Sequence, residues 1–142
     1  MSGMVQRKFL NNMRYFKFGC VLLVLLTFFN CKNNSSEAIE LITAAEMKEI
    51  SKIEGIQLVD VRTPNEYNEG HLPNALNIDF LDKNFEINIQ QLDKTKPVIV
   101  YCQRGSRSAK CASQLIANGF VKIYDLDHGF SKWKSSGLEV EK

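Results

Sequence analysis

Residues 98–107 carry the sequence Val98-Ile99-Val100-Tyr101-Cys102-Gln103-Arg104-Gly105-Ser106-Arg107. The first four residues are apolar and of strand length, and a helix-like run follows the turn, from Ser108 to Asn118. This pattern predicts that Cys102 lies at the carboxyl end of a strand and just ahead of a helix. Backbone N–H groups converge at such a position, so we expect a thiol with a lowered pKa beside an anion-binding loop.

The turn after the cysteine supplies further groups that suit this chemistry. Arg104 and Arg107 add two permanent positive charges, and Gly105 gives the backbone freedom that a tight turn requires. A lone cysteine is more often a small buried core residue, and this is the alternative interpretation of Cys102. The flanking arginines and the glycine favour the functional interpretation, with substrate bound by Gln103, Arg104, Gly105, Ser106 and Arg107.

Apolar runs of strand length alternate with helix-like segments along the chain. The strand candidates are 39–42, 56–61, 75–78, 98–101 and 122–126, and the helix candidates are 44–53, 65–69, 80–92, 108–118 and 130–135. This alternation predicts an α/β domain with a small, mainly parallel five-stranded sheet flanked by helices. In such sheets ligands bind at the carboxyl ends of the strands, where Cys102 is placed.

The first 30 residues are typical of a secretion signal. Arg14 and Lys17 precede an apolar stretch at 18–29, which is shorter than the roughly 20 residues that a spanning helix needs. We therefore expect a signal peptide at 1–30, a lipid-attachment cysteine at Cys31 with a polar tether to residue 37, and a folded domain at 38–142. Ordinary secretion and an uncleaved anchor are the alternatives.

This leader predicts a location as well as a domain boundary. A lipid-bearing Cys31 would hold the protein to a membrane of a bacterial cell envelope, with the domain facing the periplasm. Four of the 18 basic residues and none of the 16 acidic ones lie in residues 1–30. Acidic side chains therefore outnumber basic ones in the remainder, which argues against a nucleic-acid partner.

Of the four cysteines, only Cys102 and Cys111 fall in the predicted domain, too few for a disulfide framework. Cys111 shares a helical face with Ser108, Ala112 and Leu115, so we expect it to pack in the core. A resolving thiol for Cys102 is the alternative role of Cys111.

Four short motifs follow one another between Ile39 and Val140. They are Asp60-Val61-Arg62 with Glu66 and Tyr67, then Gly70-His71-Leu72-Pro73-Asn74-Ala75, then Cys102 to Arg107, and finally Gly129-Phe130 with Trp133 and Gly137. In this order and spacing they resemble the motifs of the rhodanese (sulfurtransferase) family, single-domain type. Two residues depart from the family's usual pattern, since Asn74 and His128 stand where glycine is common.

The resemblance implies a rhodanese-like fold and the transfer of sulfane sulfur through a persulfide on Cys102. The donor would be thiosulfate or a related small anion, and the acceptor a thiol or a cyanide-like nucleophile. This chemistry needs no metal and no organic cofactor, and the resemblance names no protein partner. Rhodanese-like domains also serve as protein-binding or regulatory modules without turnover, which is the alternative function.

Loop length separates this interpretation from a second enzyme class. Cysteine phosphatases, including those that share the rhodanese fold, place five residues between the cysteine and the arginine. Here four residues lie between Cys102 and Arg107, and the shorter loop favours a target smaller than phosphate. Phosphatase or arsenate reductase chemistry is therefore the weaker expectation.

The remaining motif residues are expected to have structural roles. We expect Asp60 and Arg62 to form a hydrogen-bonding corner, and Arg62 to pair with Glu66 across one helical turn. His71 is expected to hold its turn rather than act as a base, and Trp133 is expected to anchor the last helix in the core. His128 is a candidate residue of the acceptor pocket.

Overall fold

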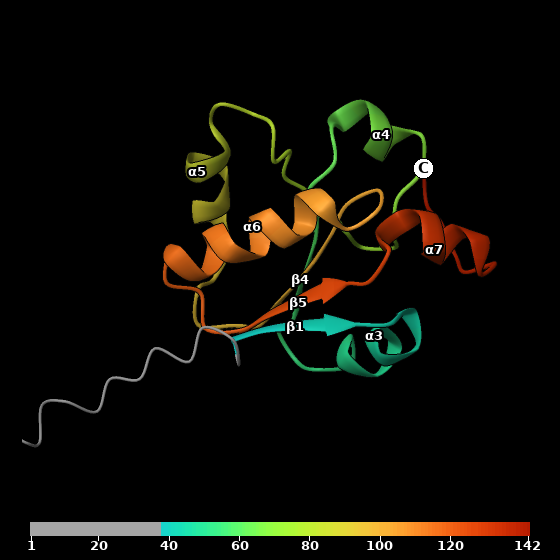
Figure 1. Cartoon of the computed structure of the whole chain (residues 1–142), viewed down its shortest axis with the longest axis horizontal. Coiled ribbons are helices and arrows are strands. Elements are labelled where there is room, and N and C mark those ends of the chain that lie inside the picture. The colour runs from blue at the N-terminus through green and yellow to red at the C-terminus, as the bar shows by residue number, and fades with distance from the viewer. Residues whose placement is uncertain (1–37) are drawn as a thin grey trace, which may run out of the picture. The chain divides into compact units, whose positions relative to one another are not determined.

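The computed structural model describes residues 38–142. The predicted signal peptide, Cys31 and the tether lie outside these residues. Five strands form one sheet in the order β1-β5-β4-β2-β3, and every pair of neighbouring strands is parallel (Figure 1). The predicted α/β class with a small parallel five-stranded sheet is confirmed. The strands are β1 (Ile39–Ile42), β2 (Gln57–Asp60), β3 (Leu76–Asn77), β4 (Val98–Tyr101) and β5 (Ile123–Leu126).

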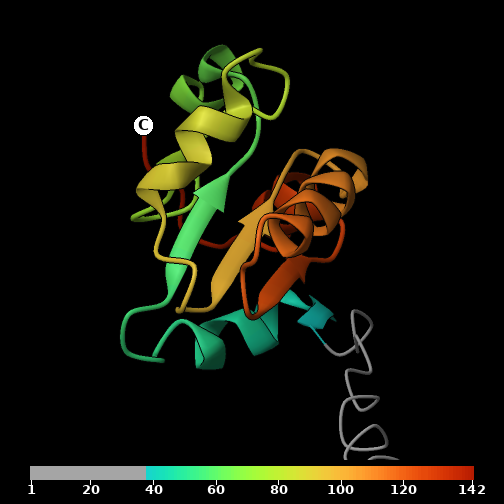
Figure 2. The same cartoon turned by 90° about the vertical axis from the view of Figure 1, so that its left-hand side faces the viewer.

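Helices cover both faces of the sheet (Figures 1 and 2). On one face α6 packs with α5 and the short 3₁₀ helix η1, and these helices share a core with the buried side chains of Val98 and Val100. On the other face α3 and α7 pack against Ile99 and Tyr101. The helices are α3 (Ala44–Ile50), α4 (Pro64–Asn68), α5 (Phe85–Asn88), η1 (Ile89–Gln91), α6 (Ser106–Ala117) and α7 (Gly129–Ser135). Because β4 is covered on both faces, all four of its residues are buried and apolar or aromatic.

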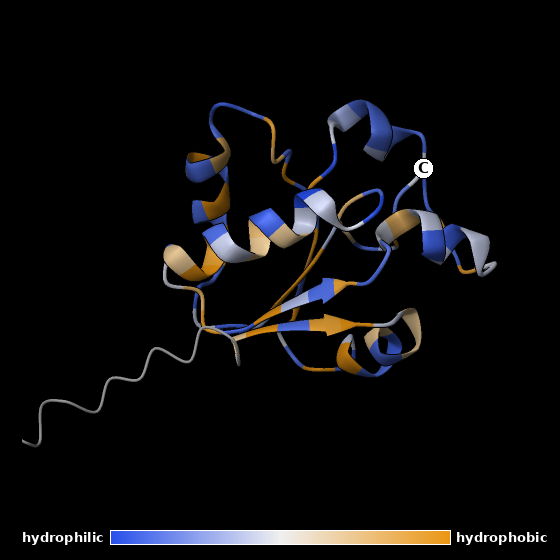
Figure 3. Cartoon of the chain, viewed as in Figure 1, coloured by the Kyte–Doolittle hydropathy of each residue, from blue (hydrophilic) through white to orange (hydrophobic). Residues whose placement is uncertain are grey.

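Helix α6 follows the cysteine loop and has one buried stripe, made of Ser108, Cys111, Ala112 and Leu115. Figure 3 shows hydrophobic and hydrophilic residues alternating along this helix, as a half-buried helix requires. The predicted packing of Cys111 in the core is confirmed, since it is 1% exposed. Among residues 38–142 no helix is both long and apolar enough to cross a membrane.

The expected helix over 80–92 is interrupted. Only Phe85–Asn88 is α-helical, followed by the 3₁₀ turn Ile89–Gln91. Asp79 and Asp82 accept hydrogen bonds from the N–H groups of the residues two further along the chain, at 2.8 Å in both cases. Such side-chain turns compete with helical hydrogen bonding, and this explains the late start of the helix.

Candidate functional site

The cysteine loop connects the carboxyl end of β4 to the first turn of α6. Gly105 lies at the N-cap of α6 with a left-handed backbone, φ 97°, which lets the chain fold back toward the cysteine. Its N–H donates a hydrogen bond to the Sγ atom of Cys102 at 3.1 Å. The sulfur is therefore held at a helix N-terminus, as the sequence predicted.

The two cysteines of the domain are both buried, yet their pKa values move in opposite directions. Burial raises the pKa of Cys102, but hydrogen bonds from the backbone of Ser108 and Arg104, the Ser108 side chain and the backbone of Gly105 outweigh it, and the pKa is lowered. Burial raises the pKa of Cys111 to about 12. Thiolate is the reactive form of cysteine, so Cys102 is the candidate nucleophile and Cys111 is not.

Arg107 is bound by a carboxylate from another helix. Its two terminal nitrogens donate to the two oxygens of Glu66 in α4, both at 2.7 Å. The expected ion pair between Arg62 and Glu66 is wrong, because Glu66 pairs with Arg107 across 41 residues of sequence. Arg107 thus fixes α4 against the first turn of α6 while keeping its positive charge near the cysteine.

Glu66 also helps to cap the N-terminus of its own helix, α4. Thr63 and Glu66 form a reciprocal capping box at the N-terminus of α4. The hydrogen bonds from Arg107, followed by those from Thr63, outweigh the effect of burial and lower the pKa of Glu66 from its ordinary 4.5 to about 2. The Thr-Pro-Asn-Glu sequence at 63–66 carries the capping-box signal, which the sequence analysis missed.

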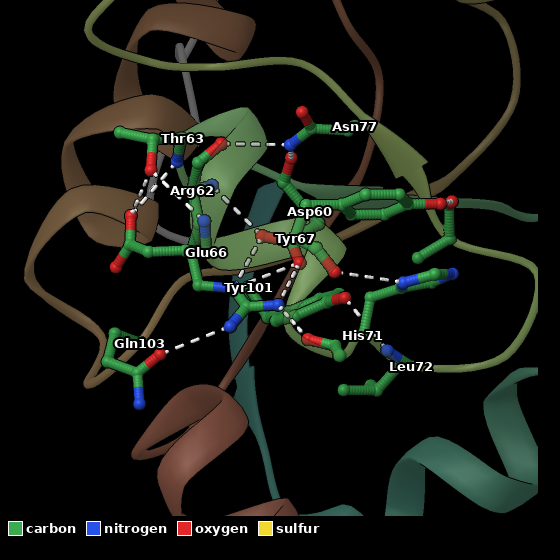
Figure 4. Close-up of polar contacts among 12 residues, drawn as sticks. Asp60, Arg62, Thr63, Glu66, Tyr67, His71, Leu72, Asn77, Tyr101 and Gln103 are labelled. Carbon is green, nitrogen blue, oxygen red and sulfur yellow. Dashed lines mark hydrogen bonds and ion pairs between the residues drawn. The ribbon is translucent and has the colours of Figure 1, made fainter. Parts of the chain in front are cut away.

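The buried guanidinium of Arg62 joins three parts of the fold. It donates to both oxygens of Asp60, with the shortest contact at 2.6 Å, and to the Gly70 carbonyl at 2.7 Å. Figure 4 shows Arg62 between Asp60 and Gln103, whose Oε1 accepts a further hydrogen bond at 3.2 Å. Asp60 is 0% and Arg62 1% exposed. The predicted hydrogen-bonding corner is present, and it supports the cysteine loop through Gln103.

The side chain of Gln103 is part of the loop's support. Its Nε2 donates to the Ser131 hydroxyl at 2.9 Å while its Oε1 accepts from Arg62. Gln103 thus braces the loop between the segment after β2 and α7, and its backbone carbonyl accepts a further hydrogen bond from the Ser131 N–H at 3.1 Å. A cavity of about 380 Å³ opens beside it, lined by Arg62, Glu66, Glu69, Gln103, Phe130, Ser131, Lys134 and Ser135.

The turn between β5 and α7 packs directly on the cysteine. A side chain on Gly129 would overlap the Cys102 carbonyl oxygen, and the Phe130 N–H donates to that oxygen at 2.9 Å. His128 precedes this contact with a left-handed backbone, φ 55°, at a position where glycine is common in the family that the sequence resembles. Its side chain is 72% exposed and lies 3.4 Å from the Asp127 carboxylate. Its role in an acceptor pocket stays a prediction.

His71 and Trp133 both contact the C-terminal segment of the domain. The His71 ring stacks on Tyr67 at 3.7 Å, and its backbone exchanges hydrogen bonds with Glu141. Trp133 is buried and donates through Nε1 to the Glu139 carbonyl at 2.7 Å. Both residues therefore hold the C-terminal segment to the domain. Within residues 38–142 no group of three His, Cys, Asp or Glu side chains is placed to hold a metal ion.

Replacing Glu66 by glutamine is expected to lower stability in a pH-dependent way. The Glu66 pKa is depressed in the folded state, so its contribution is complete above about pH 4.5 and is lost as the pH falls toward 2. Urea unfolding of the two proteins from pH 2 to 7 measures this. We expect the difference between them to be largest near neutral pH and to shrink with acid. A difference independent of pH would contradict the assigned ion pair.

Residues 43–136 match the family model of the rhodanese-like domain. A thiosulfate sulfurtransferase from Coxiella burnetii is 36% identical over 94 residues, which cover 66% of this chain and 86% of that protein. A thiosulfate sulfurtransferase from Shewanella oneidensis is 34% identical over 88 residues, covering 62% and 85%. These two relatives match the domain along most of their own length.

Solved structures show the same arrangement. A rhodanese-like domain protein from Staphylococcus aureus superimposes with a TM-score of 0.61 at 32% identity, covering 72% of this chain and 99% of that one. A rhodanese-related protein from Thermoplasma volcanium gives a TM-score of 0.61 at 28% identity, covering 72% and 97%. The likeness therefore extends to the whole sheet and its helices.

Proposed function

Because this chain belongs to the rhodanese-like domain family, we propose that it moves sulfane sulfur from thiosulfate or a related anion to a thiophilic acceptor through a persulfide on Cys102. The observation that carries the proposal is that the Cys102 Sγ accepts a hydrogen bond from the Gly105 N–H at the N-terminus of α6, a position where hydrogen bonds lower the pKa of the thiol. The names of the two sulfurtransferase relatives support the same chemistry.

The first half-reaction loads the enzyme. The Cys102 thiolate attacks the outer sulfur of thiosulfate, a new S–S bond forms, and the S–S bond of thiosulfate breaks with its electron pair leaving on sulfite. Both reactants are anions, so the repulsion between them must be offset. The N–H groups of the loop and the α6 dipole supply positive potential at the sulfur, and Arg104 adds charge.

The second half-reaction unloads it. A thiol or a cyanide-like nucleophile attacks the outer sulfur of the persulfide, and the electron pair of the breaking S–S bond returns to Cys102 as thiolate. The same N–H groups stabilise the anionic sulfur at both stages. The reaction is a ping-pong exchange in which the chain itself carries the sulfur atom.

The direct experiment is an assay of the purified protein with thiosulfate and cyanide. The proposal predicts thiocyanate and sulfite as products, with ping-pong kinetics. Hydrolysis of an aryl phosphate without formation of thiocyanate would instead favour cysteine phosphatase chemistry. The absence of both activities would favour a binding module.

Arg104 is expected to assist donor binding. Its side chain is exposed and makes no hydrogen bond or ion pair within residues 38–142, so its charge is available to an incoming anion. Arg104→Gln should raise the KM for thiosulfate several-fold, with a smaller change in kcat, and the effect should weaken at high salt. Lys110→Gln, an exposed charge further along α6, is the matched control. Equal KM values for the two variants would contradict this role.

The N-terminal leader concerns where the protein is held in the cell. We propose that Cys31 carries lipid after removal of residues 1–30 and holds the domain to a membrane of the bacterial cell envelope, facing the periplasm. The support is the sequence pattern, a basic segment and an apolar stretch ahead of Cys31. Mass spectrometry of the protein from its native membrane tests this, with an acylated Cys31 at the N-terminus as the expected result. An unmodified Cys31 would contradict it.

A further inference from the structure

Asp125 is a buried acidic residue that the proposed chemistry does not use. It lies in β5 opposite Val100 of β4, two residues before Cys102, so its side chain points to the face of the sheet covered by α6. The residue is 4% exposed, and its Oδ1 atom has no hydrogen-bond partner. A carboxylate in this state is costly, because a buried charge needs hydrogen bonds to replace water.

Ser108 lies between this carboxyl group and the sulfur. It is fully buried in the first turn of α6, and its hydroxyl donates to the Gly105 carbonyl at 3.1 Å. Hydrogen bonding from the same hydroxyl contributes to lowering the pKa of Cys102. It also lowers the pKa of Asp125, although burial has the larger and opposite effect on that group. A serine has one proton to donate, so the Gly105 carbonyl, the sulfur and the carboxylate compete for it.

The groups around Asp125 disfavour its ionised form. Burial is the largest cause that raises the pKa of Asp125, to about 6, and the negative charge of Asp127 at the end of β5 adds to it. Cys111 lies near both groups, since the charges of Asp125 and Cys102 both raise its pKa. An anionic sulfur at Cys102 would add further negative charge to this region.

We propose that Asp125 is a positioning residue for Cys102. As a neutral carboxylic acid, Asp125 donates its proton to Ser108 Oγ, and the Ser108 hydroxyl proton turns from the Gly105 carbonyl to the sulfur. This step rests on the proposed function only in taking Cys102 as the reactive group. The hydrogen bond to Ser108 would also give the carboxyl group of Asp125, whose Oδ1 atom has no partner, a hydrogen bond. In its protonated form, which predominates below its pKa of about 6, Asp125 therefore helps to hold the thiolate and the persulfide in their anionic forms.

Ionisation of Asp125 would have the opposite effect. The carboxylate would take the Ser108 proton for itself and place a second negative charge behind the sulfur. Both changes would raise the pKa of Cys102. By reciprocity, an anionic Cys102 favours the protonated form of Asp125, so the two groups titrate as a coupled pair.

The test is the pH dependence of Cys102 alkylation by iodoacetamide, followed on the Cys102 peptide by mass spectrometry. Asn in Asp125→Asn is neutral and its amide can donate to Ser108, so it imitates the protonated acid. We expect the midpoint of reactivity to fall by about 0.5 to 1 pH unit in this variant. Asp127→Asn makes the same chemical change on a more exposed side chain, and a smaller shift is expected there.

A second comparison separates the hydrogen-bonded path from simple charge removal. In a Ser108→Ala background the shift caused by Asp125→Asn should become smaller, because the connecting hydroxyl is gone. Equal shifts in the two backgrounds would overturn the role of Ser108. An unchanged midpoint in Asp125→Asn would overturn the proposal as a whole.

If Asp125→Asn does not fold, the titration of Asp125 itself gives the answer. Carboxyl-carbon NMR of the otherwise unaltered protein should give a higher midpoint for Asp125 than in Cys102→Ser, where no anionic sulfur forms. Equal midpoints would overturn the coupling. Neither experiment needs a sulfur donor, so failure of this inference is distinguishable from failure of the sulfurtransferase proposal.

Discussion

Cys102→Ser is expected to lower the transfer of sulfur from thiosulfate to cyanide by roughly a thousandfold or more. A serine hydroxyl keeps nearly the shape of the thiol but is not ionised near neutral pH and cannot form a persulfide. The loop and its N–H donors would remain, so binding of the anionic donor should be largely kept. Initial rates with thiosulfate and cyanide measure the effect, with circular dichroism to show that the variant is folded.

Cys111→Ala is the matched control, since Cys111 is the other cysteine of the described domain and is equally buried. Burial raises the pKa of Cys111 to about 12, so it is a neutral thiol at working pH and should contribute little to turnover. We expect this variant to retain most of the wild-type rate. Full activity in Cys102→Ser, or loss of activity only in Cys111→Ala, would require a different nucleophile.

Arg62→Met is expected to lower the free energy of unfolding by about 3–5 kcal/mol. The change leaves the Asp60 carboxylate buried without its partner, and it also removes the hydrogen bonds to the Gly70 carbonyl and to Gln103. Methionine retains most of the side-chain volume, so the loss reports the charge and its hydrogen bonds rather than a cavity. Urea denaturation monitored through Trp133 fluorescence measures it.

Lys52→Met is the control for this prediction. Lys52 pairs with Glu49 at 2.6 Å, as close as Arg62 and Asp60, but both side chains are mostly exposed, 68% and 74%. Exposed pairs contribute little because water screens them, so stability should hardly change. A comparable loss in the two variants would contradict the expectation that burial makes the Arg62–Asp60 pair contribute far more to stability than the exposed pair.

Much of the fold followed from local sequence patterns. The alternation of apolar runs and helical segments predicted the parallel sheet. The capping box that Thr43 and Glu46 form at the start of α3 is likewise a contact between near neighbours in the sequence. The position of Cys102 between β4 and α6 followed from the run at 98–101 and the glycine after it. These features depend on neighbours in sequence, which is why pattern analysis finds them.

The site's tertiary contacts could not be predicted in this way. Arg62 and Glu66 are four residues apart, and helical reach suggested that they pair. In the fold Arg62 pairs with Asp60, two residues away, as expected. Glu66 instead pairs with Arg107, 41 residues away in the sequence, because α4 lies beside the first turn of α6. Asp125 was missed for a similar reason, since its relation to the loop arises from the register between β4 and β5.

The sequence alone also did not show that the two arginines of the loop have different roles. Arg104 and Arg107 looked equivalent, as two charges in one loop. The structure separates them, because Arg107 is bound by Glu66 while Arg104 extends into solvent. Arg107 therefore stabilises the architecture of the site, and Arg104 remains available to an anionic donor.

The central claim is that Cys102 carries the sulfur atom as a persulfide. Incubation of the reduced protein with thiosulfate, followed by mass spectrometry of its peptides, measures this directly. The account predicts a gain equal to one sulfur atom on the Cys102 peptide, its removal by cyanide, and no such gain on the Cys111 peptide. An unmodified Cys102 after exposure to thiosulfate and other sulfane sulfur donors, in a folded and reduced protein, would contradict it.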